Sequence, residues 1–186
     1  MAFVEGNGVL TEAQHGFRTT KSTETALQIF IQNTQEAIKK KKKNPVGIFL
    51  DLTKACDVLS HKVLLSKLNS YGIRDMANSW FESHLSHRKQ RVEINTIDKG
   101  IHMSTIKEIE HGVPQGLILG AILFSLYIND LPLNITGTKI VLSADDTNIL
   151  VADENINDLR YKLNNVMTEL QTWFTLNNLL LILKRR

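Results

Sequence analysis

Two neighbouring aspartates at the centre of an apolar segment constrain the fold of this chain more than any other feature. Asp145 and Asp146 lie between two arms, 139–144 and 147–151, that are rich in β-branched and apolar residues. Two such arms around a short polar centre predict a strand, a turn and a second strand. Far upstream, the apolar run 46–50 predicts a buried strand, which Asp51 ends.

The three aspartates are candidate ligands for divalent cations. A carboxylate at the end of a buried strand loses hydration, and a bound divalent cation offsets that cost. Carboxylates at two strand ends suit a phosphoryl-transfer site with two metal ions about 3.5–4 Å apart. If so, Asp51 and Asp145 should approach within about 6 Å of each other. Alternatively, Asp145 and Asp146 form a polar turn, where aspartate is common because it hydrogen-bonds to nearby backbone. The hairpin alone favours neither interpretation.

Five sequence blocks along the chain favour the metal site over the polar turn. In order, they are QHGFRTTKST (14–23), FLDLTKACD (49–57), HGVPQGLILG (111–120), YINDLP (127–132) and SADDT (143–147). They resemble the reverse transcriptases of non-long-terminal-repeat (LINE-type) retrotransposons, particularly the jockey-like elements of animals. The resemblance extends from about Val9 to the last residue. It implies an RNA-directed DNA polymerase that transfers a deoxynucleotide to a primer 3′-hydroxyl, with an RNA template, a DNA primer and dNTP as partners.

The resemblance assigns roles to the aspartates by position. Asp51 and Asp145 match the two main metal-binding aspartates of the family, and Asp146 matches the second member of the pair. The carbonyl of Leu52 would complete the coordination of the nucleotide-bound metal. The implied cofactor is two Mg²⁺ ions, or alternatively Mn²⁺, and hard oxygen ligands suit both the ions and substrate phosphates.

Further contacts are implied on either side of the aspartates. Gln115 and the backbone of Gly116 would lie beside the template and the incoming base, since glycine lets backbone approach a ligand closely. The alternative is a Gly-Pro turn that opens a buried helix, with Pro114 in its first turn. Arg18 is the candidate contact to template or triphosphate, because a guanidinium suits phosphate. The basic stretch 88–91 either follows a nucleic-acid backbone or is the exposed start of a strand.

Several positions depart from the family pattern. Cys56 stands where the family has the Phe or Tyr that excludes the ribonucleotide 2′-hydroxyl. Ser143 replaces the Phe or Tyr that precedes Ala-Asp-Asp. Arg185 stands in place of a lysine proposed as the general acid. We also expect the thumb, the primer-grip region and the endonuclease to be missing from this fragment. These departures favour an alternative hypothesis, a catalytically dead palm remnant that at most binds nucleic acid.

Charge and cysteine content add little to this assignment. The net charge of +3 has a local source, because without lysines 39–43 only 17 of the 22 basic residues remain against 19 acidic ones. A solvated helix end explains that run better than a phosphate-binding or nuclear-import patch.

One cysteine excludes an internal disulfide and fits a reducing compartment. His84 and His87 are too few for zinc. With no signal peptide and no apolar stretch of membrane length, we expect a nuclear or cytoplasmic protein without a membrane partner.

The order of the predicted elements indicates the fold class. Residues 1–8 are expected to fray. Helices are predicted over 22–40, 61–70, 75–86, 115–128 and 155–175, and strands over 46–51, 88–95, 103–110, the hairpin 138–152, and 179–183. This order predicts an α+β fold: a polymerase palm with a split βαβ, RRM-like sheet backed by helices. The predicted single-domain fragment comprises a partial fingers segment (1–45) and a palm (46–186) with inserted fingers strands at about 75–110.

Overall fold

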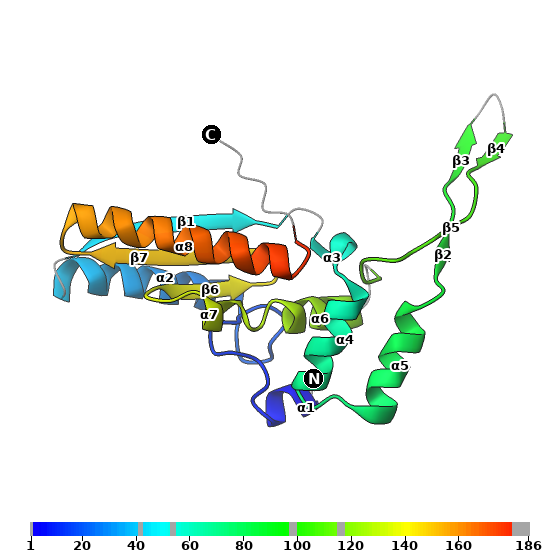
Figure 1. Cartoon of the computed structure of the whole chain (residues 1–186), viewed down its shortest axis with the longest axis horizontal. Helices are drawn as coiled ribbons and strands as arrows, with labels where there is room; N and C mark the ends of the chain where they lie inside the picture. The colour runs from blue at the N-terminus through cyan, green and yellow to red at the C-terminus, as the bar shows by residue number, and fades with distance from the viewer. Residues whose placement is uncertain (1, 41–42, 53–54, 97–99, 115–117, 180–186) are drawn as a thin grey trace.

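The computed structural model describes residues 2–40, 43–52, 55–96, 100–114 and 118–179 of the chain (Figure 1). A three-stranded antiparallel sheet is at its centre, in the order β1 (Asn44–Asp51), β7 (Asp146–Asp153), β6 (Lys139–Ser143). β6 and β7 form the predicted hairpin, and Ala144, with φ of +56°, lies in the two-residue turn between them. A left-handed residue in such a turn matches the twist of the two strands.

The strand that ends in Asp51 is an edge strand, which corrects the prediction of a buried one. Within the described strands, β1 pairs with β7 alone. Its residues Val46, Ile48 and Leu50 pack on the hydrophobic core, whereas the Phe49 side chain, on the other face, is 67% exposed. The continuous apolar run therefore does not reflect burial on both faces.

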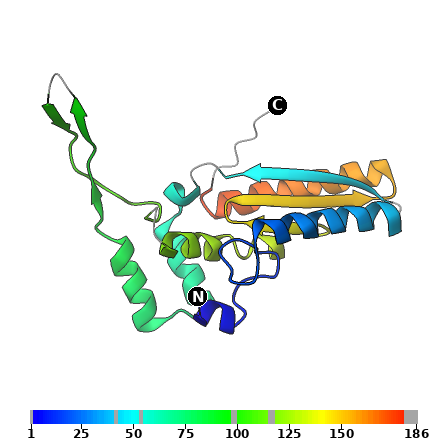
Figure 2. The same cartoon turned by 180° about the vertical axis from the view of Figure 1, so that it is seen from behind.

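Two helices cover opposite faces of this sheet (Figures 1 and 2). α8 (Ile156–Leu176) contributes Val166, Leu170 and Phe174, at the spacing of one helical face, to the same core as β7. α2 (Thr23–Gln35) lies across β6 and β7 on the other side and begins at Ser22, whose side chain caps Thr25 in a reciprocal capping box. The helix predicted over 22–40 changes its winding at Gln35, because 36–40 form a π-helical turn.

Further helices lie outside these layers. They are α1 (Ala2–Gly6), α3 (Ala55–Val58), α4 (His61–Ser70), α5 (Asp75–Leu85), α6 (Ile118–Tyr127) and α7 (Leu131–Asn134). Among them, α4 packs against α5 and α6. The predicted buried helix is confirmed as α6, where Leu123, Phe124 and Tyr127 are at most 2% exposed. The prediction of frayed residues 1–8 is wrong. Val4 of α1 is buried, and Glu5 forms an ion pair with Arg18 at 3.0 Å.

Lys67 of α4 contacts both the end of α6 and the helix α8 that covers the sheet. The Lys67 ammonium of α4 donates to the Tyr127 carbonyl at 2.6 Å and to the Asp130 carboxylate at 2.5 Å. It also lies over the rings of Tyr127 and Trp173, at 5.0 and 4.8 Å from their centroids. Burial lowers the pKa of Lys67, and the charge of Asp130 opposes that shift.

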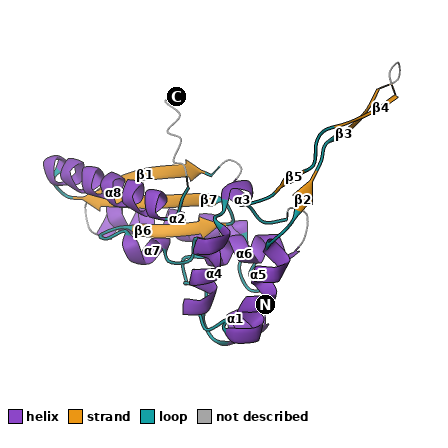
Figure 3. Cartoon of the chain, turned by 45° about the vertical axis from the view of Figure 1, so that its right-hand side comes forward, coloured by secondary structure: helices purple, strands orange, loops and turns teal. Residues whose placement is uncertain are grey.

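A thin arm extends from the end of α5 (Figure 3). It consists of two short antiparallel pairs, β2 (Lys89–Gln90) with β5 (Lys107–Glu108) and β3 (Glu93–Thr96) with β4 (Gly100–Met103). β2 and most of β3 fall inside the strand predicted over 88–95, and β5 falls inside the one predicted over 103–110, but β4 lies almost entirely before that second strand. All residues of the four strands are exposed. The predicted strand at 179–183 lies outside the described residues, apart from Leu179. Within the described part of the chain, no helix is both long enough and apolar enough to span a membrane.

Candidate active site

The register of the sheet brings two of the three predicted aspartates face to face. Asp51, the last residue of β1, is paired with Asp146, the first residue of β7. Directly opposed residues on antiparallel strands share a face, with Cβ atoms about 4.5–5.5 Å apart. Asp145 precedes Asp146 in the turn. Partial desolvation raises the pKa of Asp146, and the charges of Asp145 and then Asp51 raise it further. The three carboxylates therefore interact at one end of the sheet.

These carboxylates are exposed, which corrects the expectation that they end buried strands. For Asp146, partial desolvation comes first and the charges of Asp145 and Asp51 come second, and a bound cation would offset both effects. The donor set, three carboxylates with the Leu52 carbonyl next to Asp51, suits a hard divalent cation. Among the described residues, however, no three acidic, histidine or cysteine side chains are already gathered into a group that could hold a metal. The approach of Asp51 and Asp145 to within about 6 Å stays a prediction.

Cys56 lies within electrostatic reach of the aspartate turn. Burial raises the pKa of its thiol, and the charges of Asp145 and then Asp57 add to the shift. The Cys56 carbonyl accepts a hydrogen bond from the Val113 amide at 2.8 Å. The backbone of α3 is thus fastened to the loop at 111–114, and its small Cys56 side chain is affected by the charge of Asp145.

The loop at 111–114 is fastened to α3 and α4 by its backbone. The Gly112 amide donates to the Leu59 carbonyl at 2.8 Å, and the Gly112 carbonyl lies 2.7 Å from Nε2 of His61. Gly112 has a φ of +84°, and a Cβ on it would lie 2.6 Å from the Asp57 carbonyl oxygen. Only glycine fits this position. Gln115 and Gly116, the predicted template and base contacts, lie outside the described residues.

Residues 13–16 line the outer edge of β6 next to the aspartate turn. The His15 amide donates to the Leu142 carbonyl at 2.7 Å, and the Leu142 amide donates to the Ala13 carbonyl at 2.8 Å. Gly16 packs so closely that a Cβ on it would lie 2.3 Å from the backbone nitrogen of Ala144. Sequence reasoning missed this support for the turn. The signal was the glycine in the QHGF block.

Arg18 has its partners within the chain. Its side chain is 10% exposed, it forms an ion pair with Glu5 at 3.0 Å, and it donates to the Thr11 carbonyl at 3.2 Å. This arrangement gives Arg18 a role in holding its loop and does not support the predicted contact to template or triphosphate.

Ser143, half-buried, is paired with Asp146 at the base of the turn. Arg185, at the position of the expected general acid, lies outside the described residues.

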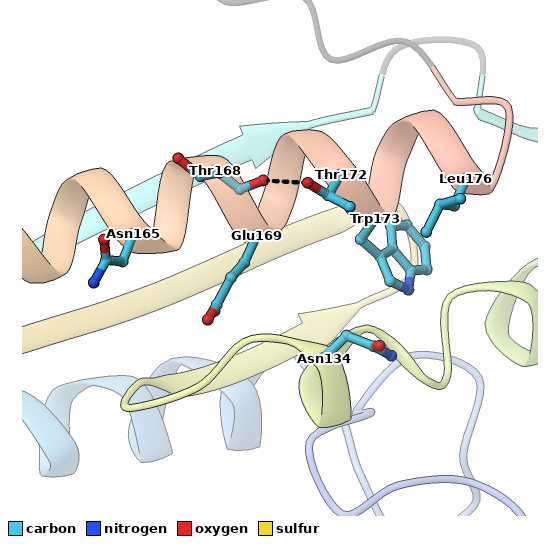
Figure 4. Close-up of a pocket in the computed structure, with 7 residues that line it drawn as sticks. All are labelled: Asn134, Asn165, Thr168, Glu169, Thr172, Trp173 and Leu176. Atoms are coloured by element: carbon cyan, nitrogen blue, oxygen red, sulfur yellow. Dashed lines mark hydrogen bonds between the residues drawn. The ribbon is translucent and has the colours of Figure 1, made fainter.

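A surface pocket of about 380 Å³ lies elsewhere, between α7 and α8 (Figure 4). Its lining includes Asn134, Glu169 and Trp173, and none of the predicted site residues. The Glu169 carboxylate accepts hydrogen bonds from the amide and the hydroxyl of Thr136, both at 2.9 Å. Glu169 thus ties α8 to the loop before β6.

Comparisons with known proteins identify the family of the chain. The profile of the family described as "Reverse transcriptase (RNA-dependent DNA polymerase)" matches residues 4–184. The RNA-directed DNA polymerase from mobile element jockey of Drosophila melanogaster is 30% identical over 167 residues, which cover 86% of this chain and 18% of that protein. The probable RNA-directed DNA polymerase from transposon BS of the same fly is 26% identical over 178 residues, covering 89% of this chain. The chain thus spans 18% of the length of these relatives.

Solved structures show the same fold. An apo telomerase from Candida tropicalis, truncated from its C-terminal domain, superposes with a TM-score of 0.60 at 15% identity, over 92% of this chain and 37% of that one. A telomerase from the same yeast in complex with a fragment of telomeric RNA also gives a TM-score of 0.60, at 12% identity. At these identities the likeness concerns the fold alone. The match of the family profile to residues 4–184 shows that this protein belongs to the reverse transcriptase family.

Proposed function

We propose that this chain is the palm of a retrotransposon reverse transcriptase, with part of the fingers, and that it extends a DNA primer on an RNA template. The observation that carries the proposal is the register that opposes Asp51 to Asp146 and leaves Asp145 in the adjoining turn. Residues 1–45 would belong to the fingers and 46–186 to the palm, with the arm at about 75–110 as inserted fingers strands.

The carboxylates would work together as ligands. Asp51, Asp145, Asp146 and the Leu52 carbonyl would hold two Mg²⁺ ions, which supply charge neutralisation for attack of the primer 3′-hydroxyl on the α-phosphate. The sheet contributes positioning, because the turn and β1 fix the carboxylates on rigid elements. Partial desolvation, and then the charges of Asp145 and Asp51, raise the pKa of Asp146, which supports a site where bound cations would stabilise the ionised carboxylates.

The remaining residues would shape the nucleotide site. Gln115 and the backbone of Gly116 would contact the template and the incoming base. Cys56, beside Asp145, would lie next to the sugar of the incoming nucleotide, and Ser143 would support the turn from below. Asp145 and Cys56 share one electrostatic environment in the structure, which supports placing both at one substrate site.

A primer-extension assay tests the proposal. The chain is supplied with a homopolymeric RNA template, a labelled DNA primer, the matching dNTP and Mg²⁺. We expect extension that EDTA abolishes and that Asp51→Asn and Asp145→Asn each reduce by at least about a hundredfold. Asp158→Asn, which removes an exposed carboxylate at the start of α8, should leave extension unchanged. Equal activity in all variants would refute the assignment.

A second candidate is a nucleic-acid-binding module without catalysis. The observation in its favour is that the described aspartates are not yet gathered as metal ligands. Cys56 and Ser143, which replace aromatic residues of the family, favour it as well. Binding of template–primer without any extension in Mg²⁺ or Mn²⁺ would select this candidate.

A further inference from the structure

A small cavity of about 190 Å³ lies at the end of the sheet opposite the aspartate turn (Figure 1). Its lining combines the end of α2 and the π-helical turn with the residues just before β1 and the start of β6, and includes Asn33, Glu36, Lys43, Thr138 and Lys139. β6 rises about 13 Å from Lys139 to Ser143, which adjoins the aspartate turn. The cavity is therefore separate from the candidate active site.

Two lysines from distant segments converge on this cavity. Within the described part of the chain, the ammonium groups of Lys43 and Lys139 have neither a hydrogen bond nor an ion pair. Glu36 lines the cavity as well, so two ammonium groups are set against one carboxylate. Like charges that share a site disfavour each other's charged form, and a bound anion would remove that cost.

The dipole of the preceding helix does not account for this pair of lysines. Cations favour the last turn of a helix because its free carbonyls carry partial negative charge, which explains the exposed Lys39. Lys43 lies beyond the helix, where its amide donates to the Ala37 carbonyl at 2.8 Å, and Lys139 belongs to β6. A π-helical turn is itself rare and is frequent at functional sites.

We propose that this cavity binds a phosphate group of single-stranded RNA, at a site separate from the aspartates. Lysine binds phosphate as a point charge, and the half-buried Asn33 adds a neutral amide donor to the lining. The cavity is several times the volume of a water molecule, which gives room for one phosphate group. The choice of RNA as the source of that phosphate rests on the proposed function, in which the template is RNA.

The first test measures the Kd of a fluorescent single-stranded RNA over a range of salt concentrations, without primer or dNTP. For single strands, each phosphate contact adds about 0.7 to the slope of log Kd against log salt. Lys43→Gln and Lys139→Gln should each lower the slope by about 0.7 and raise Kd in 0.1 M salt about fivefold. Arg160→Gln, which removes an exposed charge of α8 on the other face of the sheet, should change neither.

The fold should not change in these variants. Because neither ammonium group is paired in the described structure, the melting temperatures of Lys43→Gln and Lys139→Gln should equal that of the unaltered chain. Lys139→Arg, which keeps the charge, should retain the salt slope. Equal slopes in the glutamine variants and the unaltered chain, or no binding of RNA by the unaltered chain, would overturn this inference.

Two competitors identify the source of the phosphate. Inorganic phosphate carries the group without a strand, and polyglutamate of equal length carries the charges without phosphates. At constant ionic strength, neither should displace the labelled RNA at phosphate or carboxylate concentrations at which unlabelled RNA displaces it. Displacement by inorganic phosphate would overturn the assignment in favour of a free anion, and displacement by polyglutamate would overturn it in favour of an acidic protein.

The binding assay is independent of catalysis, which separates this inference from the proposed function. RNA binding that depends on Lys43 and Lys139, in a chain that extends no primer, would refute polymerase activity and leave the phosphate site standing. Primer extension by a chain whose RNA binding is the same in both lysine variants would refute the phosphate site and leave the proposed function standing.

Discussion

At the scale of single residues, three glycines hold loops against backbone in places where no side chain fits. A Cβ on Gly16 would meet Ala144 nitrogen at 2.3 Å, on Gly112 the Asp57 carbonyl at 2.6 Å, and on Gly120 the Pro114 carbonyl at 2.3 Å. From the sequence, we assigned close backbone approach to Gly116 alone. The contacts of Gly16 and Gly112 join segments that are distant in the chain, so the sequence marked these glycines but not the backbone against which they pack.

Gly112→Ala should destabilise the fold more than a matched substitution at another left-handed glycine. Both Gly112 and Gly137 have positive φ, but a Cβ on Gly137 would meet nothing within 4 Å. Gly137→Ala should cost about 1 kcal/mol of unfolding free energy from the backbone alone. Gly112→Ala should cost about 2–4 kcal/mol, because the overlap with Asp57 is added. Urea unfolding of the two variants measures the difference, and equal costs would contradict the close packing of this loop.

Asp146→Asn should stabilise the folded chain at neutral pH. The folded-state pKa of Asp146 is raised above its unfolded value, so the folded state holds this proton more tightly. Stability from this group is therefore fully present below the unfolded pKa and is lost as pH rises through the folded pKa. Asparagine removes that loss. The melting temperature of the variant should exceed that of the unaltered chain at pH 7, and the gap should close at pH 3. A gap that widens in acid would refute the assigned repulsion.

Cys56→Phe should restore discrimination against ribonucleotides. A ring at this position would fill the space beside the 2′ carbon of the sugar, whereas the thiol leaves room for a hydroxyl. Exclusion by steric fit is worth about 1–3 kcal/mol, or roughly ten- to two-hundredfold in selectivity. The measurement is steady-state incorporation of matched deoxy- and ribonucleotides by both chains. Unchanged selectivity would mean that Cys56 is not at the sugar, and inactivity of both chains would favour the catalytically dead remnant.

At the scale of elements, the sequence predicted those whose periodicity is strong. The helix at 61–70 and the hairpin are confirmed, and α8 (Ile156–Leu176) matches the helix predicted over 155–175. Three short helices, α1, α3 and α7, were not predicted, because four or five residues are too short for a periodic signal. The burial of β1 was overestimated. An apolar run does not reveal which strands will lie on either side of it.

Lys67 is an element-scale feature, because it links α4 to the end of α6 and to α8. Lys67→Met should lower the free energy of unfolding by about 2–3 kcal/mol. The expected cost is smaller than for an ion pair whose remaining partner is fully buried, because the Asp130 side chain is 31% exposed and stays partly solvated. The matched control is Lys62→Met on the same helix, which removes an exposed lysine and should change stability by less than about 0.5 kcal/mol. Chemical denaturation measures both, and equal effects would show that the junction contributes nothing.

At the scale of the whole molecule, the chain has a packed body and an arm with no buried residue in its four strands. Amide hydrogens of β3 and β4 should exchange within the earliest time points of a hydrogen-exchange experiment, whereas those of central β7 should exchange only on global unfolding. The reason is that the arm's hydrogen bonds are open to water, while Ile149 and Val151 of β7 are fully buried. Strong protection in the arm would show that it packs against something in solution.

The fold class and the family could be predicted from the sequence, because both rest on ordered blocks of residues rather than on details of packing. The candidate site was predicted only in part. Asp51 and Asp146 were expected at adjacent strand ends and are paired there. Arg18 was selected for its phosphate-binding chemistry, but the structure engages it with Glu5 on α1, in a segment that was expected to fray. The contact of Arg18 with template or triphosphate stays a prediction, and the helix α1 whose Glu5 pairs with this side chain was not predicted.

The position of β1 at the edge of the sheet bears on how the protein will behave at high concentration. Among the described residues, no strand pairs with the outer side of this strand, and such a row of backbone amides and carbonyls is a template for another chain. Pro45 removes one donor from the strand, but Phe49 leaves an apolar ring exposed near its end. Self-association should therefore begin at the strand that carries Asp51, so that aggregation and loss of the site coincide. Phe49→Lys should delay light scattering on concentration, because a charged side chain on an edge strand opposes pairing between chains.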